Sequence, residues 1–462
     1  MKLVYNVNDK PKFGQLIIFA IQQLLAIMTA TLVVPFIINT NEGLNNAGIY
    51  AEMDTAAALL GAGIGTLVYL LFTQKKSPVF LGSSFAFIGS MVAAFAGATS
   101  IAGGYLGLIL GAFFAGLVYV IIALIVKFVG TGWVNKVMPA VVIGPTVAII
   151  GLSLAGSAIE NISKGSIPGV AASPIATVFC GIVTLVITII CSTYGKKFVK
   201  LIPFIFGILG GYAVALILTL IGAALKFDAI RILNLQKLSD LFANGIHLET
   251  FFSVPDFTFL TAYKGLGDLS ASYIGTVAVA YIPVAFVVFA EHIADHKNIS
   301  SIIEQDLLSE PGLHRTLLGD GVGSIVGALF GGCPNTTYGE SVGCVAITKN
   351  ASVVTILAAA ILAILIAFIS PFIAFVESIP DCVVGGICMA LYGFIAVSGL
   401  KMIQGVNLNE NKNLFVVSTI LIAGIGGLTL SFGKVTVTSV ACALILGILV
   451  NIIVSKAKEQ EQ

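Results

Sequence analysis

The sequence predicts an all-α polytopic membrane protein with about 14 transmembrane segments. Of its 462 residues, 58% are hydrophobic and only 10% are charged, and the mean hydropathy is +1.06. A soluble domain carries about 25% charged residues. Apolar runs of roughly 20 residues, enough to cross about 30 Å of hydrocarbon, recur from end to end. The first run, 13–38, is longer than the apolar part of a signal peptide and lacks a small-residue cleavage site, so we interpret it as a membrane span.

The lysine and arginine residues predict the orientation in the membrane. With both ends of the chain inside, the inner loops hold all but six of the 23 lysine and arginine residues. This bias predicts an even number of spans and cytoplasmic termini. The six residues in outer loops are Lys164, Lys226, Arg231, Lys237, Lys264 and Lys434.

The longest stretch without a predicted span, 226–270, divides the chain into two halves of seven spans each. An odd number of spans per half means that the halves insert upside down relative to each other, as in the inverted repeats of secondary transporters. A weak sequence similarity between the two halves fits this organisation: "MPAVVIG" (138–144) opens the fifth span and "IPDCVVG" (379–385) opens the twelfth.

The third span of each half is interrupted. The first-half segment reads "SPVFLGSSFAFIGS" from Ser77, and the second-half segment reads "CPNTTYGESVGCVAIT" from Cys333. Each has a proline near its start, then a short piece of extended character, then Gly, Ser or Thr before a helical stretch. Paired interrupted segments at matching positions indicate a binding site near the membrane midplane. Irregular backbone at that depth is tolerated only where protein or a cavity covers it.

Two carboxylates lie in predicted spans. Glu291 ends the run "TVAVAYIPVAFVVFAEHIAD", and Glu340 lies in the second interrupted segment. An intramembrane ionisable group costs at least ~2.5 kcal/mol and is a functional hypothesis by default. The alternatives are that Glu291 faces water at the cytoplasmic end of its helix, and that Glu340 makes an interhelical hydrogen bond without a ligand.

A protonated carboxyl group offers a donor and an acceptor side by side, which matches the N–H and C=O edge of a nucleobase. Burial favours the neutral form, so the same group can take up a proton. Free backbone N–H groups at 339–341 suit a carbonyl oxygen. Phe85 and Tyr338 either stack on a flat ring or simply pack. Asp295 lies one turn from Glu291 on the same face, where it can tune the proton affinity of Glu291.

The run "EHIADH" raises the question of a metal site. His292 and His296 are four residues apart and share a helical face. The glutamate does not lie between the histidines as in H-E-x-x-H, and no convincing third ligand follows, so we predict no metal and no intramembrane protease. We place His296 in the cytoplasmic loop, and Asp320 faces either a cavity or the inner surface.

Other features argue against further partners. No basic patch with interleaved aromatic residues indicates nucleic acid. The seven cysteines are odd in number and mostly lie inside apolar runs, so we predict small buried hydrophobic residues rather than disulfides or metal ligands. They are Cys180, Cys191, Cys333, Cys344, Cys382, Cys388 and Cys442.

Several motifs resemble the uracil permease branch of the nucleobase–ascorbate transporter family. They are "FAEHI", "DLLSEPGLHR", "PNTTYGESVGCVAITK", "LGSSFAFI" and "GGICMALYG", and the likeness covers essentially the whole chain. The resemblance implies a multi-pass, proton-coupled uracil importer in the lipid bilayer of a bacterial-type plasma (inner) membrane, which uses no cofactor and is not an enzyme. It also implies short antiparallel strands in spans three and ten, a homodimer, and an elevator motion of a core domain against a gate domain.

The resemblance implies the following domains and site residues. The core domain takes 13–128 and 271–376, the gate domain takes 138–225 and 382–456, and an extracellular connection takes 226–270. Glu291 and Glu340 are implied to hydrogen-bond the substrate, and Glu291 and Asp295 to couple protons. The remaining implied substrate-binding residues are Phe85 beside the ring, Tyr338 and Gly339 just before Glu340, and Tyr392 of the gate domain.

The sequence departs from the family at three places. Asp295 stands where the best-known bacterial uracil symporter has a histidine, Ser341 where asparagine is preferred, and Gln23 where a histidine is common. The purine-transporting branch typically has glutamine at the place of Glu340, so a xanthine-type purine permease is the first alternative. A channel or anion exchanger of the related fold is a second, although it would favour a cationic or dipole-only site.

Overall fold

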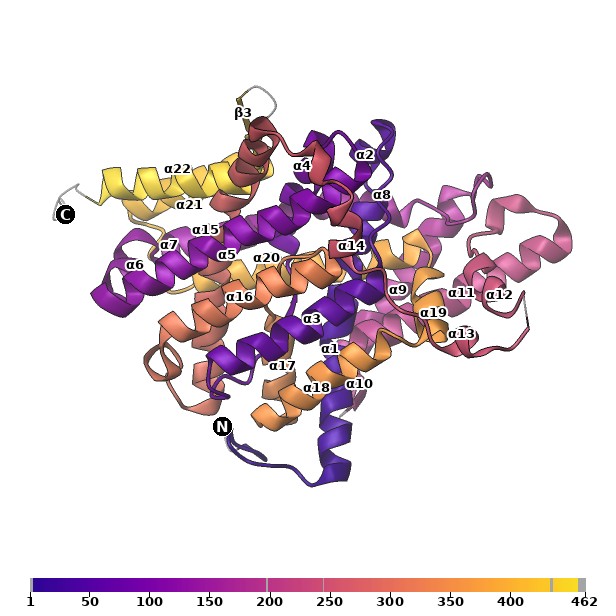
Figure 1. Ribbon diagram of the computed structural model, residues 1–462, viewed down its shortest axis with the longest axis horizontal. Helices are drawn as coiled ribbons and strands as arrows, with labels where there is room; N and C mark the ends of the chain where they lie inside the picture. Colours follow the sequence, from indigo (N-terminus) through magenta and orange to yellow (C-terminus); the bar gives the residue numbers. More distant parts are fainter. Residues whose placement is uncertain (1–2, 197, 244, 433–434, 456–462) are drawn as a thin grey trace.

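The computed structural model describes residues 3–455 with gaps at 197, 244 and 433–434. The first half of this mostly helical chain ends at residue 225, and the loop-rich connection 226–270 follows it (Figure 1). The elements up to the end of the connection are α1 (Phe13–Asn39), α2 (Glu42–Asn46), α3 (Thr55–Phe72), β1 (Leu81–Ser83), η1 (Phe85–Phe87), α4 (Ile88–Gly97), α5 (Ile101–Val129), α6 (Gly132–Val137), α7 (Ala140–Ser153), α8 (Ala155–Ile162), α9 (Pro174–Tyr194), α10 (Phe198–Leu201), α11 (Pro203–Leu225), η2 (Asp228–Ile230), α12 (Gln236–Ala243), α13 (Leu248–Phe251), α14 (Thr258–Tyr263) and η3 (Leu266–Asp268).

The second half repeats the pattern of long helices around one short strand and adds a hairpin near its end. Its elements are α15 (Ala271–Ile303), η4 (Leu308–Gly312), α16 (Leu313–Gly331), β2 (Asn335–Thr337), α17 (Gly339–Thr348), α18 (Val353–Ile366), α19 (Ser370–Glu377), α20 (Asp381–Met402), α21 (Asn411–Ile425), β3 (Leu430–Phe432), β4 (Val435–Val437) and α22 (Ser439–Val454). The β3–β4 hairpin was not predicted from the sequence.

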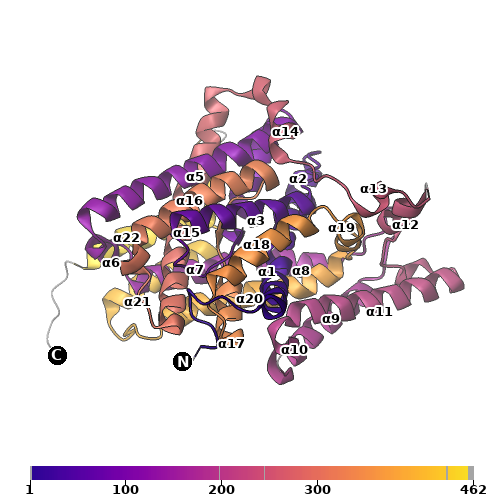
Figure 2. The ribbon, with the colours of Figure 1, turned by 60° about the horizontal axis from the view of Figure 1, so that its bottom comes forward.

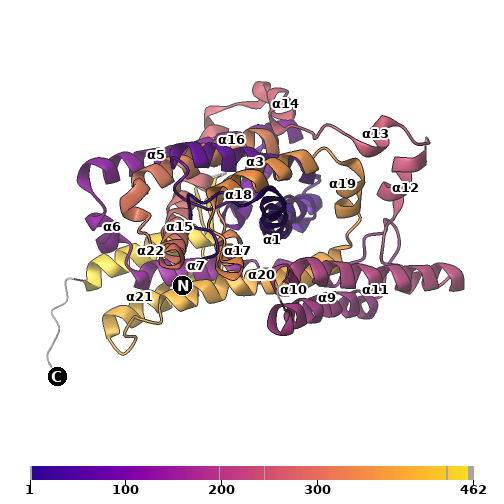
Figure 3. The ribbon, with the colours of Figure 1, turned by 90° about the horizontal axis from the view of Figure 1, so that it is seen from below.

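Eight helical segments of the described chain are long and apolar enough to cross a membrane, which confirms a multi-pass membrane protein. The helices form two main layers (Figure 3). One layer holds α3, α5, α16 and α18, with α16 packed against both α3 and α5. The other holds α9, α11, α20 and α21, and α9 and α11 lie together at one edge of the molecule (Figure 2). Helices α1, α15 and α17 lie between the layers, and α7 packs against α20 and α21 of the second layer.

Strands β1 and β2 pair between the layers, as the family resemblance implied. They are antiparallel, with Leu81 opposite Thr337 and Ser83 opposite Asn335, and all their residues are buried. Each strand leads at once into helical backbone, β1 into η1 and α4, and β2 into α17. The pairing satisfies backbone groups that hydrocarbon could not, and two helices therefore begin inside the protein.

Glycine residues bring α3 and α16 into close contact. A Cβ atom built on Gly61 would lie 2.4 Å from the carbonyl oxygen of Gly327, and one on Gly65 would lie 2.7 Å from that of Gly323. Small residues let two helix backbones approach closely where the hydrophobic effect cannot drive association. The same approach positions β2, because Asn335 donates from Nδ2 to the carbonyl oxygen of Gly61 at 3.1 Å.

The placement of His296 in a cytoplasmic loop was wrong. Helix α15 continues beyond Glu291 to Ile303, and His296 is fully buried inside it. The polar residues after Glu291 look like a loop in the sequence, but the fold supplies buried partners for them, such as the hydroxyl of Tyr69.

We expect Gly61→Ala to destabilise the protein by about 1–3 kcal/mol, because the new methyl group would meet backbone atoms that cannot move aside. The measurement is the Tm of the detergent-solubilised protein. Gly275→Ala is the matched control, since Gly275 lies within α15 with no atom in the way. Equal Tm values for the two variants would contradict the close contact between α3 and α16.

Candidate binding site

Helix α17 begins in the interior of the protein. Its N-cap residue, Tyr338, is extended (φ −107°, ψ 123°) and makes no side-chain cap, so the first-turn N–H groups lack capping from that side chain. Gly339 is exposed and Glu340 is half-buried, whereas Ser341 is fully buried. The start of α17 therefore borders accessible space, and it presents backbone N–H groups and one carboxylate there.

Helix α15 packs beside α17 and brings two more acids to this place. Asp295 accepts at Oδ2 a hydrogen bond from Thr337 Oγ1 at 3.0 Å, and its Oδ1 would lie 3.6 Å from a Cβ atom on Gly339. Glu291 lies one turn earlier on α15 and is half-buried. The structure thus gathers Glu291, Asp295, Gly339 and Glu340 around the start of α17.

The aromatic rings of Phe85 and Tyr392 are in contact. Phe85 comes from η1, directly after β1, and Tyr392 comes from α20. Their ring centroids are 5.9 Å apart with an interplanar angle of 80°, an edge-to-face contact. Both side chains are buried, at 8% and 2% exposure.

Tyr338 packs rather than facing open space. Its ring lies over Gly82, where a Cβ atom would be only 2.4 Å from two ring carbons. Its hydroxyl donates to the carbonyl oxygen of Ser83 at 2.7 Å. The sequence left open whether Tyr338 stacks on a flat ring or packs, and in this structure it packs. Its contacts link β2 to β1.

Two of the departures from the family pattern contact each other. Gln23 of α1 donates from Nε2 to Ser341 Oγ, and the backbone N–H of Phe80 donates to the same oxygen at 3.0 Å. This serine therefore joins α1, the segment before β1, and the first turn of α17. Sequence reasoning treated Gln23 and Ser341 separately, because nothing in the chain marks a pair 318 residues apart.

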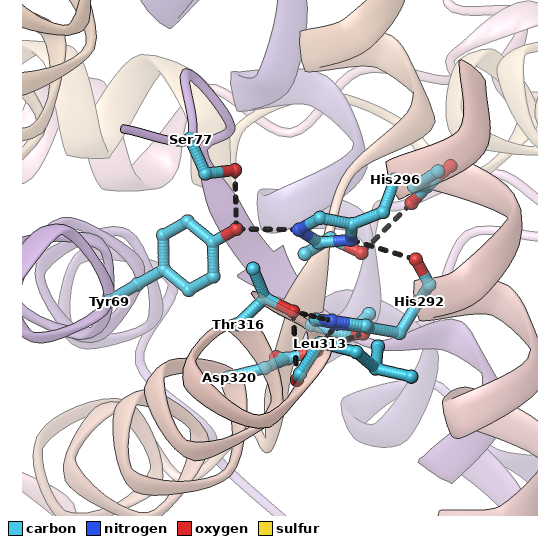
Figure 4. Close-up of polar contacts among 10 residues, drawn as sticks. Tyr69, Ser77, His292, His296, Leu313, Thr316 and Asp320 are labelled. Atoms are coloured by element: carbon cyan, nitrogen blue, oxygen red, sulfur yellow. Dashed lines mark hydrogen bonds and ion pairs between the residues drawn. The ribbon is translucent and has the colours of Figure 1, made fainter. Parts of the chain in front are cut away.

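A buried polar network joins side chains of α3, α15 and α16 (Figure 4). The hydroxyl of Tyr69 is 2.7 Å from His296 Nε2 and 2.7 Å from Ser77 Oγ. His296 Nδ1 is 2.8 Å from the carbonyl oxygen of His292 and therefore donates to it. The two imidazole rings stack with centroids 4.0 Å apart.

His292 makes its own contacts in this network. Its Nδ1 is 2.7 Å from Asp320 Oδ2, and its Nε2 is 3.0 Å from Thr316 Oγ1. Asp320 is fully buried, so of its two predicted positions the inner surface is wrong. Sequence reasoning weighed His292 only as a metal ligand. In the part of the chain that the structure describes, no group of three or more His, Cys, Asp and Glu residues could hold a metal ion.

We expect Ser341→Ala to cost about 1–3 kcal/mol of stability, because it would leave the buried donors of Gln23 and Phe80 without an acceptor. Thermal unfolding in detergent measures this loss. Ser418→Ala on α21 is the control, since its exposed hydroxyl bonds only the nearby carbonyl of Phe415. An unchanged Tm for Ser341→Ala would show that the serine does not join these segments.

Residues 14–433 match the model of the Permease family (Xan_ur_permease). The chain is 37% identical over 466 residues to the uracil permease of Bacillus subtilis (strain 168), with 100% of this chain and 97% of that protein covered. It is 32% identical over 451 residues to the uracil permease of Escherichia coli (strain K12), with 97% and 93% covered.

Two solved structures share the fold at low sequence identity. The transmembrane domain of the cyanobacterium bicarbonate transporter BicA aligns with a TM-score of 0.58 at 14% identity, covering 98% of this chain and all of that one. The murine anion transporter Slc26a9 in its inward-facing state aligns with a TM-score of 0.61 at 12% identity, covering 97% and 69%. The fold is therefore that of a membrane transporter, and the chain belongs to the Permease family, whose members are transport proteins rather than enzymes.

Proposed function

We propose that this protein imports uracil across the plasma membrane together with protons. The full-length relatives named uracil permease support the substrate. The observation that carries the proposal is the arrangement of Asp295, Gly339 and Glu340 at the start of α17, with Glu291 one turn from Asp295 on α15 and Gly339 exposed. Two acids, free backbone N–H groups and an aromatic ring suit a flat, neutral heterocycle.

Each group has a role toward such a ring. Protonated Glu340 and Glu291 each present a donor beside an acceptor, the complement of the N–H and C=O edge of uracil. The N-terminal N–H groups of α17 suit a carbonyl oxygen. Phe85 offers its ring for stacking, and Gly339 leaves room for the substrate to approach the backbone. The hydrogen bond of Tyr338 to Ser83 positions the end of β2, which precedes Gly339.

Proton coupling is assigned to Glu291 and Asp295. They lie one turn apart on α15, and the Thr337 hydroxyl ties Asp295 to the strand that leads to Glu340. Binding of uracil at Glu340 can therefore change the surroundings of both acids. An inward proton gradient then supplies the driving force for accumulation.

We further propose 14 spans arranged as two inverted repeats of seven. The eight long apolar helices, four shorter apolar ones, helix α16 and the β2–α17 segment together provide this number. The matching order of strand and helix in β1–η1–α4 and β2–α17 supports the repeat. The bias of lysine and arginine toward the predicted inner loops supports cytoplasmic termini.

The two layers support a core domain of 13–128 and 271–376 and a gate domain of 138–225 and 382–456, of which residue 456 lies outside the described chain. Residues 226–270 form the extracellular connection. Movement of core against gate would carry Phe85 past Tyr392. The exposed apolar faces of α9 and α11, which include Ile175 and Leu220, suit lipid and the partner in a homodimer.

Glu340→Gln and Glu291→Gln are each expected to reduce uracil uptake by about 10- to 100-fold, because an amide cannot take up a proton or reproduce the donor pattern of a carboxyl group. Uptake of labelled uracil by permease-deficient cells measures this, with the amount of protein in the membrane determined in parallel. The control is Glu249→Gln in the exposed connection. If both site variants transport like the parent, the site is wrongly assigned.

Uracil uptake is expected to rise as the external pH falls and to collapse when a protonophore is added. The sign follows from symport: a higher proton concentration outside drives more protons, and with them uracil, inward. Uptake by proteoliposomes with an imposed pH gradient measures the dependence. Uptake that ignores this gradient and follows a sodium gradient would contradict proton coupling.

Competition for uptake distinguishes a uracil permease from the alternative of a xanthine-type purine permease. We expect excess unlabelled uracil to suppress uptake of labelled uracil, and xanthine and other purines to leave it unchanged, because the carboxyl group of Glu340 presents a different donor pattern from the amide of the purine branch. The assay uses permease-deficient cells and a panel of purines and pyrimidines. Stronger competition by xanthine than by uracil would favour the purine permease.

A further inference from the structure

His292 and Asp320 form a buried pair that the proposed transport site does not use. Both side chains are 0% exposed, and Nδ1 of the histidine is 2.7 Å from Oδ2 of the aspartate (Figure 4). Helix α15 supplies the histidine and α16 the aspartate. Buried ionisable groups in a membrane protein are functional candidates by default.

The hydrogen bonds suit a state in which this pair holds one extra proton. Thr316 is placed to donate its hydroxyl hydrogen to the carbonyl oxygen of Leu313 at 3.1 Å. With the hydroxyl in that orientation, Thr316 accepts from His292, and Nε2 of His292 carries a hydrogen. The remaining contact, between Nδ1 and Oδ2, then needs one more hydrogen, because without it two acceptors would face each other.

This shared hydrogen belongs to the pair as a whole. If it lies on nitrogen, an imidazolium faces a carboxylate, and if it lies on oxygen, a neutral imidazole faces a carboxylic acid. The net charge is zero in both cases. Loss of the proton takes the pair to −1 and leaves Asp320 dependent on another donor. Thr336 Oγ1, which donates to Oδ2 from 3.4 Å, is that donor.

The pair is connected to the proposed substrate site through strand β2. Thr336 contacts Asp320, and the next residue, Thr337, donates to Asp295. The chain then runs through Tyr338 to Glu340. A shift of β2 on substrate binding would therefore change the contact of Thr336 with Asp320. A shorter contact favours the carboxylate and a longer one favours the protonated pair.

Other ionisable groups face the pair and take part in its electrostatics. Helix α15 itself supplies Glu291, Asp295 and His296, α5 supplies Tyr119, α3 supplies Tyr69, and β2 supplies none. The ring of Tyr119 meets that of His292 edge-on, with centroids 6.3 Å apart.

We propose that His292 and Asp320 form a second proton-carrying site, which holds one proton beside strand β2 and exchanges it once in each transport cycle. The proton leaves the Nδ1–Oδ2 hydrogen bond when Thr336 moves onto the carboxylate and passes to the carboxylate of the adjacent, half-buried Glu291, and it returns from Glu291 when Thr336 withdraws. The pair does not touch uracil. This inference rests on the proposed function, because it concerns the proton that accompanies uracil.

The variant Asp320→Asn distinguishes a proton-carrying role of the pair from a purely structural one. An asparagine of the same shape can donate one Nδ2 hydrogen to the lone pair on Nδ1 of neutral His292 and the other to Thr336 Oγ1. The contacts of the pair are kept, but the exchangeable proton is gone. A structural role would tolerate this change, whereas a proton-carrying role would not.

The experiment compares two modes of transport in proteoliposomes under an inward proton gradient. Exchange of labelled for unlabelled uracil requires only binding and movement, whereas accumulation requires coupling to protons. We expect Asp320→Asn to exchange uracil at the rate of the parent but to bring internal uracil no higher than external uracil. Asp240→Asn, the same change at an exposed position on α12, is the control and should accumulate uracil normally.

Accumulation by Asp320→Asn at the level of the parent would overturn the proposal. If this variant loses exchange as well, His292→Phe/Asp320→Leu decides, because removing both partners leaves neither of them unpaired. Exchange without accumulation in the double variant supports the proposal, and loss of exchange there overturns it in favour of a structural role. Failure of the parent itself to exchange uracil would instead contradict the proposed function.

Discussion

The antiparallel pairing of β1 with β2 is the interaction on which the rest of the structure depends. Extended backbone inside a membrane protein must find hydrogen-bond partners within the protein, because hydrocarbon offers none. The two strands satisfy each other, and side chains complete the arrangement: Thr66 accepts from the N–H of Leu81, and Tyr338 donates to the carbonyl of Ser83. Two helical segments can therefore start deep inside the protein.

The surrounding helices follow from the need to enclose this pair. Close glycine contacts let α16 lie against α3, so that Asn335 of β2 reaches the carbonyl oxygen of Gly61. Helix α15 lies along the other side and brings Asp295 to the hydroxyl of Thr337. Polar side chains that would be unfavourable in lipid thus form a network around the strands, in which Asp295 and Asp320 each have hydrogen-bond partners.

Patterns that are local in the sequence predicted the architecture well. Hydropathy and charge bias predicted a multi-pass helical protein, and the family resemblance implied the strands. Contacts between distant residues were not predictable, because no local pattern marks them. The pair of His292 with Asp320, the contact of Gln23 with Ser341, and the β3–β4 hairpin belong to this class.

The central claim is that a flat neutral ring lies between Phe85 and the start of α17, held by two carboxyl groups. A structure of the protein determined with uracil bound tests this most directly. The account predicts that side-chain oxygens of Glu291 and Glu340 lie within hydrogen-bonding distance of the ring, about 2.6–3.2 Å. A ring bound elsewhere, or acids that point away from it, would contradict the account.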